Sequence, residues 1–116
     1  MPPAAAPTPA SPTADAASLT RRAGEAADFL KALAHQNRLL LLCLLSEQER
    51  TVSELEALLG LPQPTVSQQL ARLRADGLVA TRREGKSVVY SLASDDVRRV
   101  IGVVHDIFCR PDPGMA

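Results

Sequence analysis

Apolar residues recur at helical spacing along much of the chain, and this pattern predicts helices over residues 19–33 and 37–46. Two shorter helices are expected next, over residues 51–59 and 64–76. The expected buried stripes are Leu19, Ala23, Ala26, Phe29, Leu30 and Leu33 in the first helix, Leu55, Leu58 and Leu59 in the third, and Val66, Leu70 and Leu73 in the fourth.

Local signals mark the ends of the two short helices. Thr51 and Glu54 have the spacing of a capping box, with Ser53 as an alternative cap. Gly60 suits the left-handed residue that ends a helix. Pro64 suits a first helical turn, where its missing N–H would have no partner in any case. These signals predict two helices joined by a tight turn.

The period then changes to that of β-structure. Residues 78–82 and 87–92 predict two strands, with Glu84-Gly85-Lys86 as the turn of a hairpin. A last helix is expected from Asp95, and Arg110-Pro111 should end it. Its expected stripe is Val97, Val100, Ile101, Val104 and Phe108.

This order of elements predicts a mostly α fold with a small β-hairpin, a winged helix-turn-helix with four helices, two strands and a fifth helix. We expect the folded domain to span residues 19–110. Residues 1–18, rich in Pro and Ala, are expected to be a disordered tail, and residues 111–116 a short one.

Composition narrows the possible functions. The 116 residues carry 13 Lys and Arg against 13 Asp and Glu, a formal net charge of zero. No apolar run approaches the ~20 residues of a membrane span, and no basic segment precedes an apolar one as in a secretory signal. Two cysteines are too few for a disulfide scaffold. We therefore expect a cytoplasmic protein that contacts no membrane. The chain offers no motif of an enzyme, such as Cys-x-x-Cys, a phosphate loop or a Ser-His-Asp set.

The fourth helix and the hairpin carry the side chains expected to read DNA. Gln can pair with an adenine edge and Arg with guanine, whereas hydroxyl groups bind phosphate or base. Basic residues on the hairpin suit phosphates or the minor groove. A solvated helix face, or a winged-helix module that binds protein, remains the alternative. The candidate DNA-binding residues are Gln63, Thr65, Ser67, Gln68, Gln69, Arg72, Arg82, Arg83 and Lys86.

Three segments together resemble the ArsR/SmtB family of repressors. The family's second helix begins with a segment similar to Leu33-Ala34-His35-Gln36-Asn37-Arg38-Leu39, and residues 64–79 and 82–92 resemble its recognition helix and wing. The resemblance covers about residues 20–109. It implies a homodimer formed through the first and last helices, which binds an inverted-repeat operator in double-stranded DNA and represses transcription until an inducer arrives.

Many members of that family sense metals, but the ligands are poorly represented here. Residues 53–57, where soft-metal members carry Cys-x-Cys, contain no cysteine. The last helix offers Asp95, Asp96, His105 and Asp106, with only one His for a zinc site that usually needs about four ligands. A symmetric site from His105 and Asp106 of two chains stays open. No metal or other cofactor is predicted.

Cys43 and Cys109 are the candidate sensing residues. From chemistry alone, each could be a small apolar filler, or the two could form a thiol switch. Their surroundings, Leu41-Leu42-Cys43-Leu44-Leu45 and Ile107-Phe108-Cys109, resemble the persulfide-responsive (SqrR/BigR-like) branch of the family. The resemblance implies that reactive sulfur species join the two cysteines through a polysulfide of tetrasulfide type and thereby derepress sulfide-metabolism genes. A metal- or metalloid-responsive repressor, or a general thiol-oxidation sensor, is the alternative.

A hypothesis about selectivity follows from disulfide geometry. A direct disulfide needs Cα atoms within about 7 Å, whereas a chain of several sulfur atoms spans a longer gap. Two thiols held slightly too far apart would therefore favour a polysulfide over simple oxidation.

Overall fold

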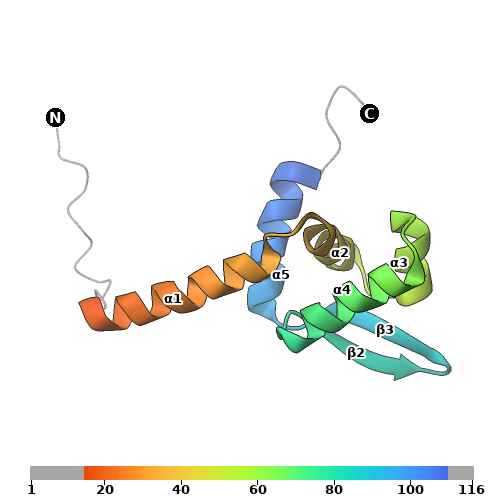
Figure 1. The fold of residues 1–116 in the computed structure, drawn as a ribbon, viewed down its shortest axis with the longest axis horizontal. Helices are drawn as coiled ribbons and strands as arrows, with labels where there is room; N and C mark the ends of the chain where they lie inside the picture. The colour runs from red at the N-terminus through yellow and green to blue at the C-terminus, as the bar shows by residue number, and fades with distance from the viewer. Residues whose placement is uncertain (1–14, 110–116) are drawn as a thin grey trace. The chain divides into compact units, whose positions relative to one another are not determined.

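The computed structural model describes residues 15–109, with Cys109 described by its backbone alone. The chain divides into two compact units between Lys31 and Ala32, and each is treated separately below. The fold is the expected winged helix-turn-helix, and Figure 1 shows its order of elements. The elements are α1 (Ala16–Leu33), α2 (Gln36–Glu47), β1 (Arg50–Thr51), α3 (Val52–Leu59), α4 (Gln63–Ala75), β2 (Val79–Glu84), β3 (Ser87–Leu92), α5 (Asp95–Val104) and a π-helical turn, η1 (His105–Cys109).

Helix α1 begins three residues earlier than expected. The Ser18 N–H donates to Asp15 Oδ1 at 2.7 Å, so this carboxylate caps the helix and the expected disordered tail is wrong at residues 16–18. The prediction of a buried stripe on α1 is wrong for Leu19 and Leu30, which are each 57 % exposed in a single chain, whereas Leu33 is buried. The remainder of the expected tail, residues 1–14, lies outside the described residues, as do the Arg110-Pro111 stop and the tail 111–116.

The helix-turn-helix forms as its capping signals predict. The Glu54 N–H donates to Thr51 Oγ1 at 3.2 Å, and the Thr51 N–H donates to Glu54 Oε1 at 2.9 Å. Gly60 has φ 66°, the left-handed conformation that side chains disfavour. The expected α3 stripe is wrong at Leu58, which is 54 % exposed, because only one face of this short helix packs on α4. The core-facing side chains of the pair are Leu55, Val66, Leu70 and Leu73.

The hairpin belongs to a three-stranded antiparallel sheet of order β1-β3-β2. Its loop is shorter than expected, because Glu84 already pairs with Ser87 and leaves a two-residue turn with Gly85 at φ 62°. The added strand β1 pairs Thr51 with Val89. With only two residues, β1 presents no alternating pattern that a sequence could reveal.

The last helix changes type near its end. Ser94 caps it by accepting the Val97 N–H at 3.2 Å, and Val97 and Ile101 are buried as expected. Five residues, His105–Cys109, then form the π turn. A π turn has more residues per turn than an α-helix, so the expected stripe does not continue, and Phe108 is 77 % exposed.

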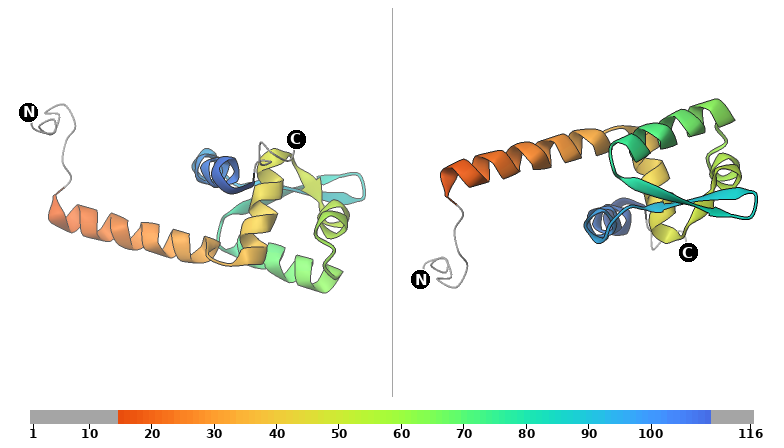
Figure 2. Two further views of the ribbon diagram at one scale, coloured as in Figure 1. Left: turned by 90° about the horizontal axis from the view of Figure 1, so that it is seen from above. Right: turned by 90° about the horizontal axis from the view of Figure 1, so that it is seen from below.

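Helix α2 forms the centre of the second unit. It contacts α4, β3 and α5, and in both views of Figure 2 it lies between α5 and α3. Its buried residues are Leu41, Leu42, Cys43 and Leu45. No helix within residues 15–109 is both long and apolar enough to cross a bilayer.

Candidate nucleic-acid interface and cysteine pair

The candidate DNA-reading residues of α4 lie opposite its core-facing leucines. Because Val66, Leu70 and Leu73 face the core, the polar positions on the other side of the helix turn outward. Among the expected residues, Thr65 and Gln69 are half-buried, whereas Gln63, Ser67, Gln68 and Arg72 are exposed. The helix thus presents donors and acceptors on its outer face, as a recognition helix must.

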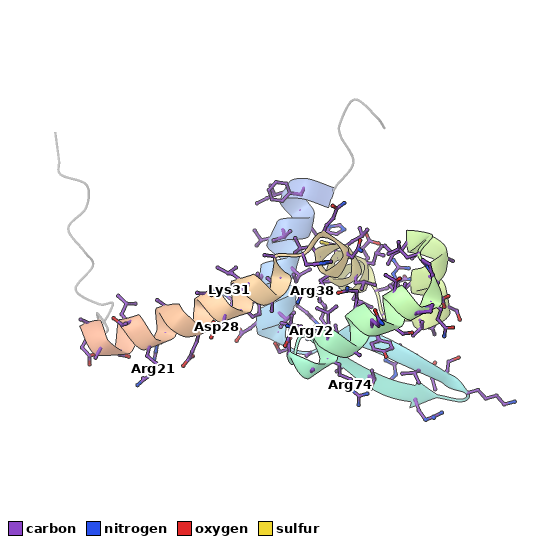
Figure 3. All side chains as sticks on the ribbon, in the orientation of Figure 1. Arg21, Asp28, Lys31, Arg38, Arg72 and Arg74 are labelled. Carbon is purple, nitrogen blue, oxygen red and sulfur yellow. The ribbon has the colours of Figure 1, made fainter. Side chains whose placement is uncertain are left out.

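An ion-pair chain connects α2 with the end of α4. Asp76 Oδ2 lies 3.4 Å from Arg72 Nε and 3.9 Å from Arg38 Nη1. Figure 3 labels both arginines, together with Arg74 further along α4. Arg38 Nε is buried and has no hydrogen-bond partner among the described residues. Asp76 therefore restrains Arg72, which the sequence assigned to DNA, and also neutralises part of its charge.

The three basic residues of the wing differ in their surroundings. Arg82 lies between two carboxylates, with Nη1 2.6 Å from Glu49 Oε1 and Nη2 2.6 Å from Glu84 Oε2. These hydrogen bonds raise the pKa of Arg82. Arg83 follows it in the strand and so faces the other side of the hairpin. Within residues 15–109, Arg83 and Lys86 form no ion pair, so they suit phosphate binding better than Arg82 does.

The two candidate sensing cysteines lie on segments that contact each other. Cys43 is on α2 and only 5 % exposed. Cys109 is the last residue of η1, and its side chain lies outside the described part of the chain. Helix α2 and η1 are in contact. The redox role of both residues stays a prediction.

One polar contact joins the same two segments, and no sequence pattern predicts it. His105 Nε2 lies 2.8 Å from Glu47 Oε2, across 58 positions of sequence. Arg50 Nη2 donates to the other oxygen of Glu47 at 2.9 Å. The hydrogen bond from His105 lowers the pKa of Glu47, and the charges of His105 and Arg50 act in the same direction, although burial opposes them.

The alternative metal site would combine His105 and Asp106 of two chains. Within one chain, the His105 ring faces Glu47 and Asp106 is exposed. Among the described side chains, no three of the types His, Cys, Asp and Glu converge on a common point.

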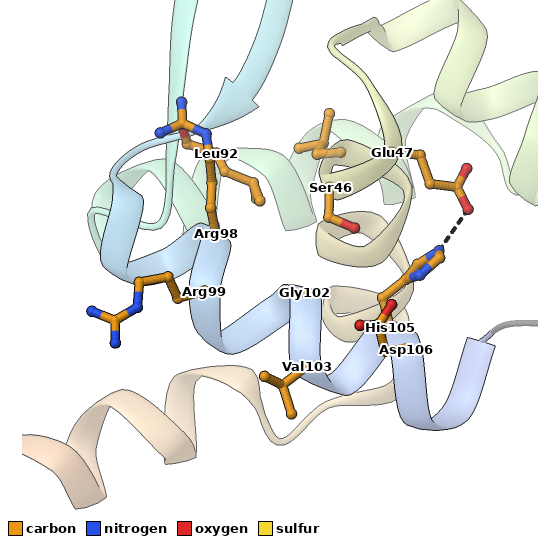
Figure 4. A pocket seen from close by; sticks show the side chains of 10 residues that line it. Ser46, Glu47, Leu92, Arg98, Arg99, Gly102, Val103, His105 and Asp106 are labelled. Carbon is orange, nitrogen blue, oxygen red and sulfur yellow. Dashed lines mark hydrogen bonds and ion pairs between the residues drawn. The ribbon is translucent and has the colours of Figure 1, made fainter.

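A pocket of about 530 Å³ lies between α2 and α5. Figure 4 shows Arg98 toward one end and the Glu47–His105 contact toward the other. Arg98 is held in place, because it donates to the Leu92 carbonyl at 3.2 Å and pairs with Asp95 at 2.9 Å. The pocket is lined by Leu45, Ser46, Glu47, Leu92, Arg98, Arg99, Gly102, Val103, His105 and Asp106.

Comparison with known proteins gives consistent matches. A sequence profile described as "Bacterial regulatory protein, arsR family" matches residues 35–81. The biofilm growth-associated repressor of Agrobacterium fabrum is 48% identical over 98 residues, which cover 84% of each chain. The crystal structure of the transcriptional repressor BigR from Xylella fastidiosa has a TM-score of 0.78 and 42% identity, covering 82% of this chain and 94% of that one. Reduced HlyU from Vibrio cholerae has a TM-score of 0.75 and 41% identity, covering 80% and 98%.

Proposed function

Because the chain belongs to the bacterial ArsR family of regulatory proteins, we propose that it is a dithiol repressor that reactive sulfur species release from its operator. It is a transcriptional regulator of the BigR and HlyU type rather than an enzyme. The finer proposal concerns the inducer. It is supported by one observation above all: α2, which carries Cys43, contacts η1, which carries Cys109.

The reduced protein binds operator DNA as a homodimer. Helix α4 enters the major groove, and the β2–β3 wing contacts the adjacent backbone. Exposed apolar side chains on the first and last helices support dimerisation through these elements, because a lone chain rarely leaves so many large apolar groups in water. A two-fold dimer reads an inverted repeat. The exposed side chains are Leu19 and Leu30 on α1, Val103 on α5, and Ile107 and Phe108 on η1.

Induction is a sulfur-transfer reaction that needs no other oxidant. One cysteine thiolate attacks the outer sulfur of a persulfide RS–SH, a new S–S bond forms, and the donor's S–S bond breaks to release RS⁻, which takes a proton. Repeated transfer lengthens the chain of sulfur atoms. The second cysteine thiolate then attacks the sulfur next to the terminal one and expels hydrosulfide. For a tetrasulfide, three donor sulfurs enter and one leaves as hydrosulfide.

Bridging joins α2 to η1 within one protomer. Since η1 continues the last helix, and that helix is proposed to lie at the dimer interface, the bridge changes the spacing of the two α4 helices. A coupling of only about 1–3 kcal/mol between the two sites is enough for regulation.

The test combines DNA binding with intact mass. An operator duplex is selected from a random pool, and the wild type, Cys43→Ser and Cys109→Ser are titrated with organic persulfide. We expect all three to bind the duplex, and only the wild type to be released, as its mass rises by the bridging sulfur atoms less two hydrogens. Because Cys43 is buried, Cys43→Ala serves as a second variant that avoids placing a hydroxyl in the core.

Several outcomes would overturn this proposal. Release of a single-cysteine variant by persulfide would exclude the dithiol mechanism. Equal release of the wild type by peroxide would indicate a general thiol sensor, and release by zinc or arsenite with both cysteines reduced would indicate a metal- or metalloid-responsive repressor.

A further inference from the structure

The last helix changes from α to π at His105, whose side chain bonds to Glu47 of α2. The N–H of His105 still bonds to the carbonyls of Ile101 and Gly102, which closes the α-helix. Residues 105–109 then form the π turn. Such turns are rare, and they frequently mark functional sites because they re-aim the residues that follow them. Here the turn carries both His105 and Cys109.

The acceptor of this contact, Glu47, is also held by a second partner, Arg50. Glu47 Oε1 accepts from Arg50 Nη2 at 2.9 Å, while Arg50 Nε donates to the Leu44 carbonyl at 3.1 Å. The Arg50 side chain is only 12% exposed. Both oxygens of Glu47 are thus engaged, one with β1 and one with η1. A carboxylate fixed in this way gives its partner one preferred position.

The spacing relates this contact to the two cysteines. Cys43 precedes Glu47 by four residues, about one turn of α2. Cys109 follows His105 by four residues, about one turn of η1. Each cysteine is therefore roughly one helical turn from the point where the two segments are joined.

We propose that Glu47 and His105 are positioning residues that hold η1 against α2 and thereby set the gap across which Cys43 and Cys109 are bridged. This inference rests on the proposed function, because it assigns the bridge to these two cysteines. Glu47 and His105 do not react with sulfur. They restrict the bridge to one length, and their loss lets η1 sample several separations.

Mass spectrometry of the bridged peptides measures this restriction. Glu47→Gln and His105→Ala are compared with the wild type after treatment with organic persulfide. We expect one dominant bridge in the wild type, and in the variants a roughly fivefold higher share of other bridges, the plain disulfide included, because an exposed charge-assisted hydrogen bond shifts a local equilibrium by about that factor. His105→Gln, which keeps a side-chain N–H donor, should restore part of the preference.

A matched control separates positioning from charge. Asp106→Asn removes one negative charge, as Glu47→Gln does, but from the residue next to His105 in η1. Asp106 forms no ion pair within residues 15–109. This control should keep the wild-type bridge. An unchanged distribution of bridges in both Glu47→Gln and His105→Ala would overturn the inference, as would an equal change in Asp106→Asn.

A second measurement tests the positioning role without using persulfides. Bifunctional thiol reagents of increasing span are reacted with the reduced proteins, and the fraction that is cross-linked within a chain is recorded for each span. We expect a narrow optimum in the wild type and a broad one in His105→Ala. Identical span profiles would refute the positioning role whether or not persulfides act. A broadened profile together with no persulfide reaction would refute the proposed function alone.

Discussion

The two adjacent arginines of the wing should contribute very differently to DNA binding. Arg82 is held between Glu49 and Glu84 at 2.6 Å each, whereas Arg83 faces the other side of the hairpin without an ion pair among the described residues. A cation already neutralised by carboxylates displaces few counterions from DNA. Each phosphate contact contributes about 0.9 to the slope of log K against log[salt].

For a dimer, Arg83→Gln therefore removes two contacts and should lower that slope by about 1.8. By the same rule, the contact that Arg83→Gln removes from each protomer strengthens binding roughly eightfold when the salt concentration falls from about 1 M to about 0.1 M, and the variant loses that gain. Arg82→Gln should change the slope by less than half as much. Fluorescence anisotropy of a labelled operator duplex over a series of salt concentrations measures both slopes. A fall in slope as large for Arg82→Gln as for Arg83→Gln would refute the reasoning.

Three further predictions concern folding, pH and assembly. Thr51→Ala removes the α3 cap and should cost about 1 kcal/mol of unfolding free energy in urea titrations, whereas Ser53→Ala, its control, should cost a few tenths at most. The lowered pKa of Glu47 implies a stabilisation that is present above its ordinary value of 4.5 and lost as pH falls through its folded-state value. When the free energy of unfolding is measured by urea titration at a series of acidic pH values, Glu47→Gln should lack this loss of stability and Asp106→Asn should keep it. Phe108→Glu places a charge on the exposed apolar face, so sedimentation should show a monomer, and an unaltered dimer would place the interface elsewhere.

The parts of the fold that the sequence predicts well are those formed by near neighbours. The capping box of Thr51 and Glu54 and the left-handed Gly60 each depend on residues at most a few positions apart. The buried face of α4 follows from helical spacing alone. The start of helix α1 also depends on a local signal, because Asp15 stands three residues before Ser18 and caps the helix.

The parts that could not be predicted depend on distant partners. The pairing of Arg82 with Glu49 and of His105 with Glu47 requires the packing of separate elements, and neither carries a spacing that a single sequence reveals. The π turn is likewise absent from the apolar pattern, which suggested a regular helix as far as Phe108. The candidate DNA surface can thus be predicted from residue types. The fold is needed to tell which of its basic side chains are already paired with carboxylates.

The two-residue strand β1 has a mechanical consequence. Thr51 pairs with Val89 in the sheet and also caps α3, so the wing and the helix-turn-helix share a residue at their junction. The two parts that are proposed to contact DNA are thereby joined through one shared residue within each protomer. We expect operators whose groove spacing differs from this geometry to be accommodated by deformation of the duplex or by a shift between protomers, because no linker residue separates the wing from the helix-turn-helix at Thr51.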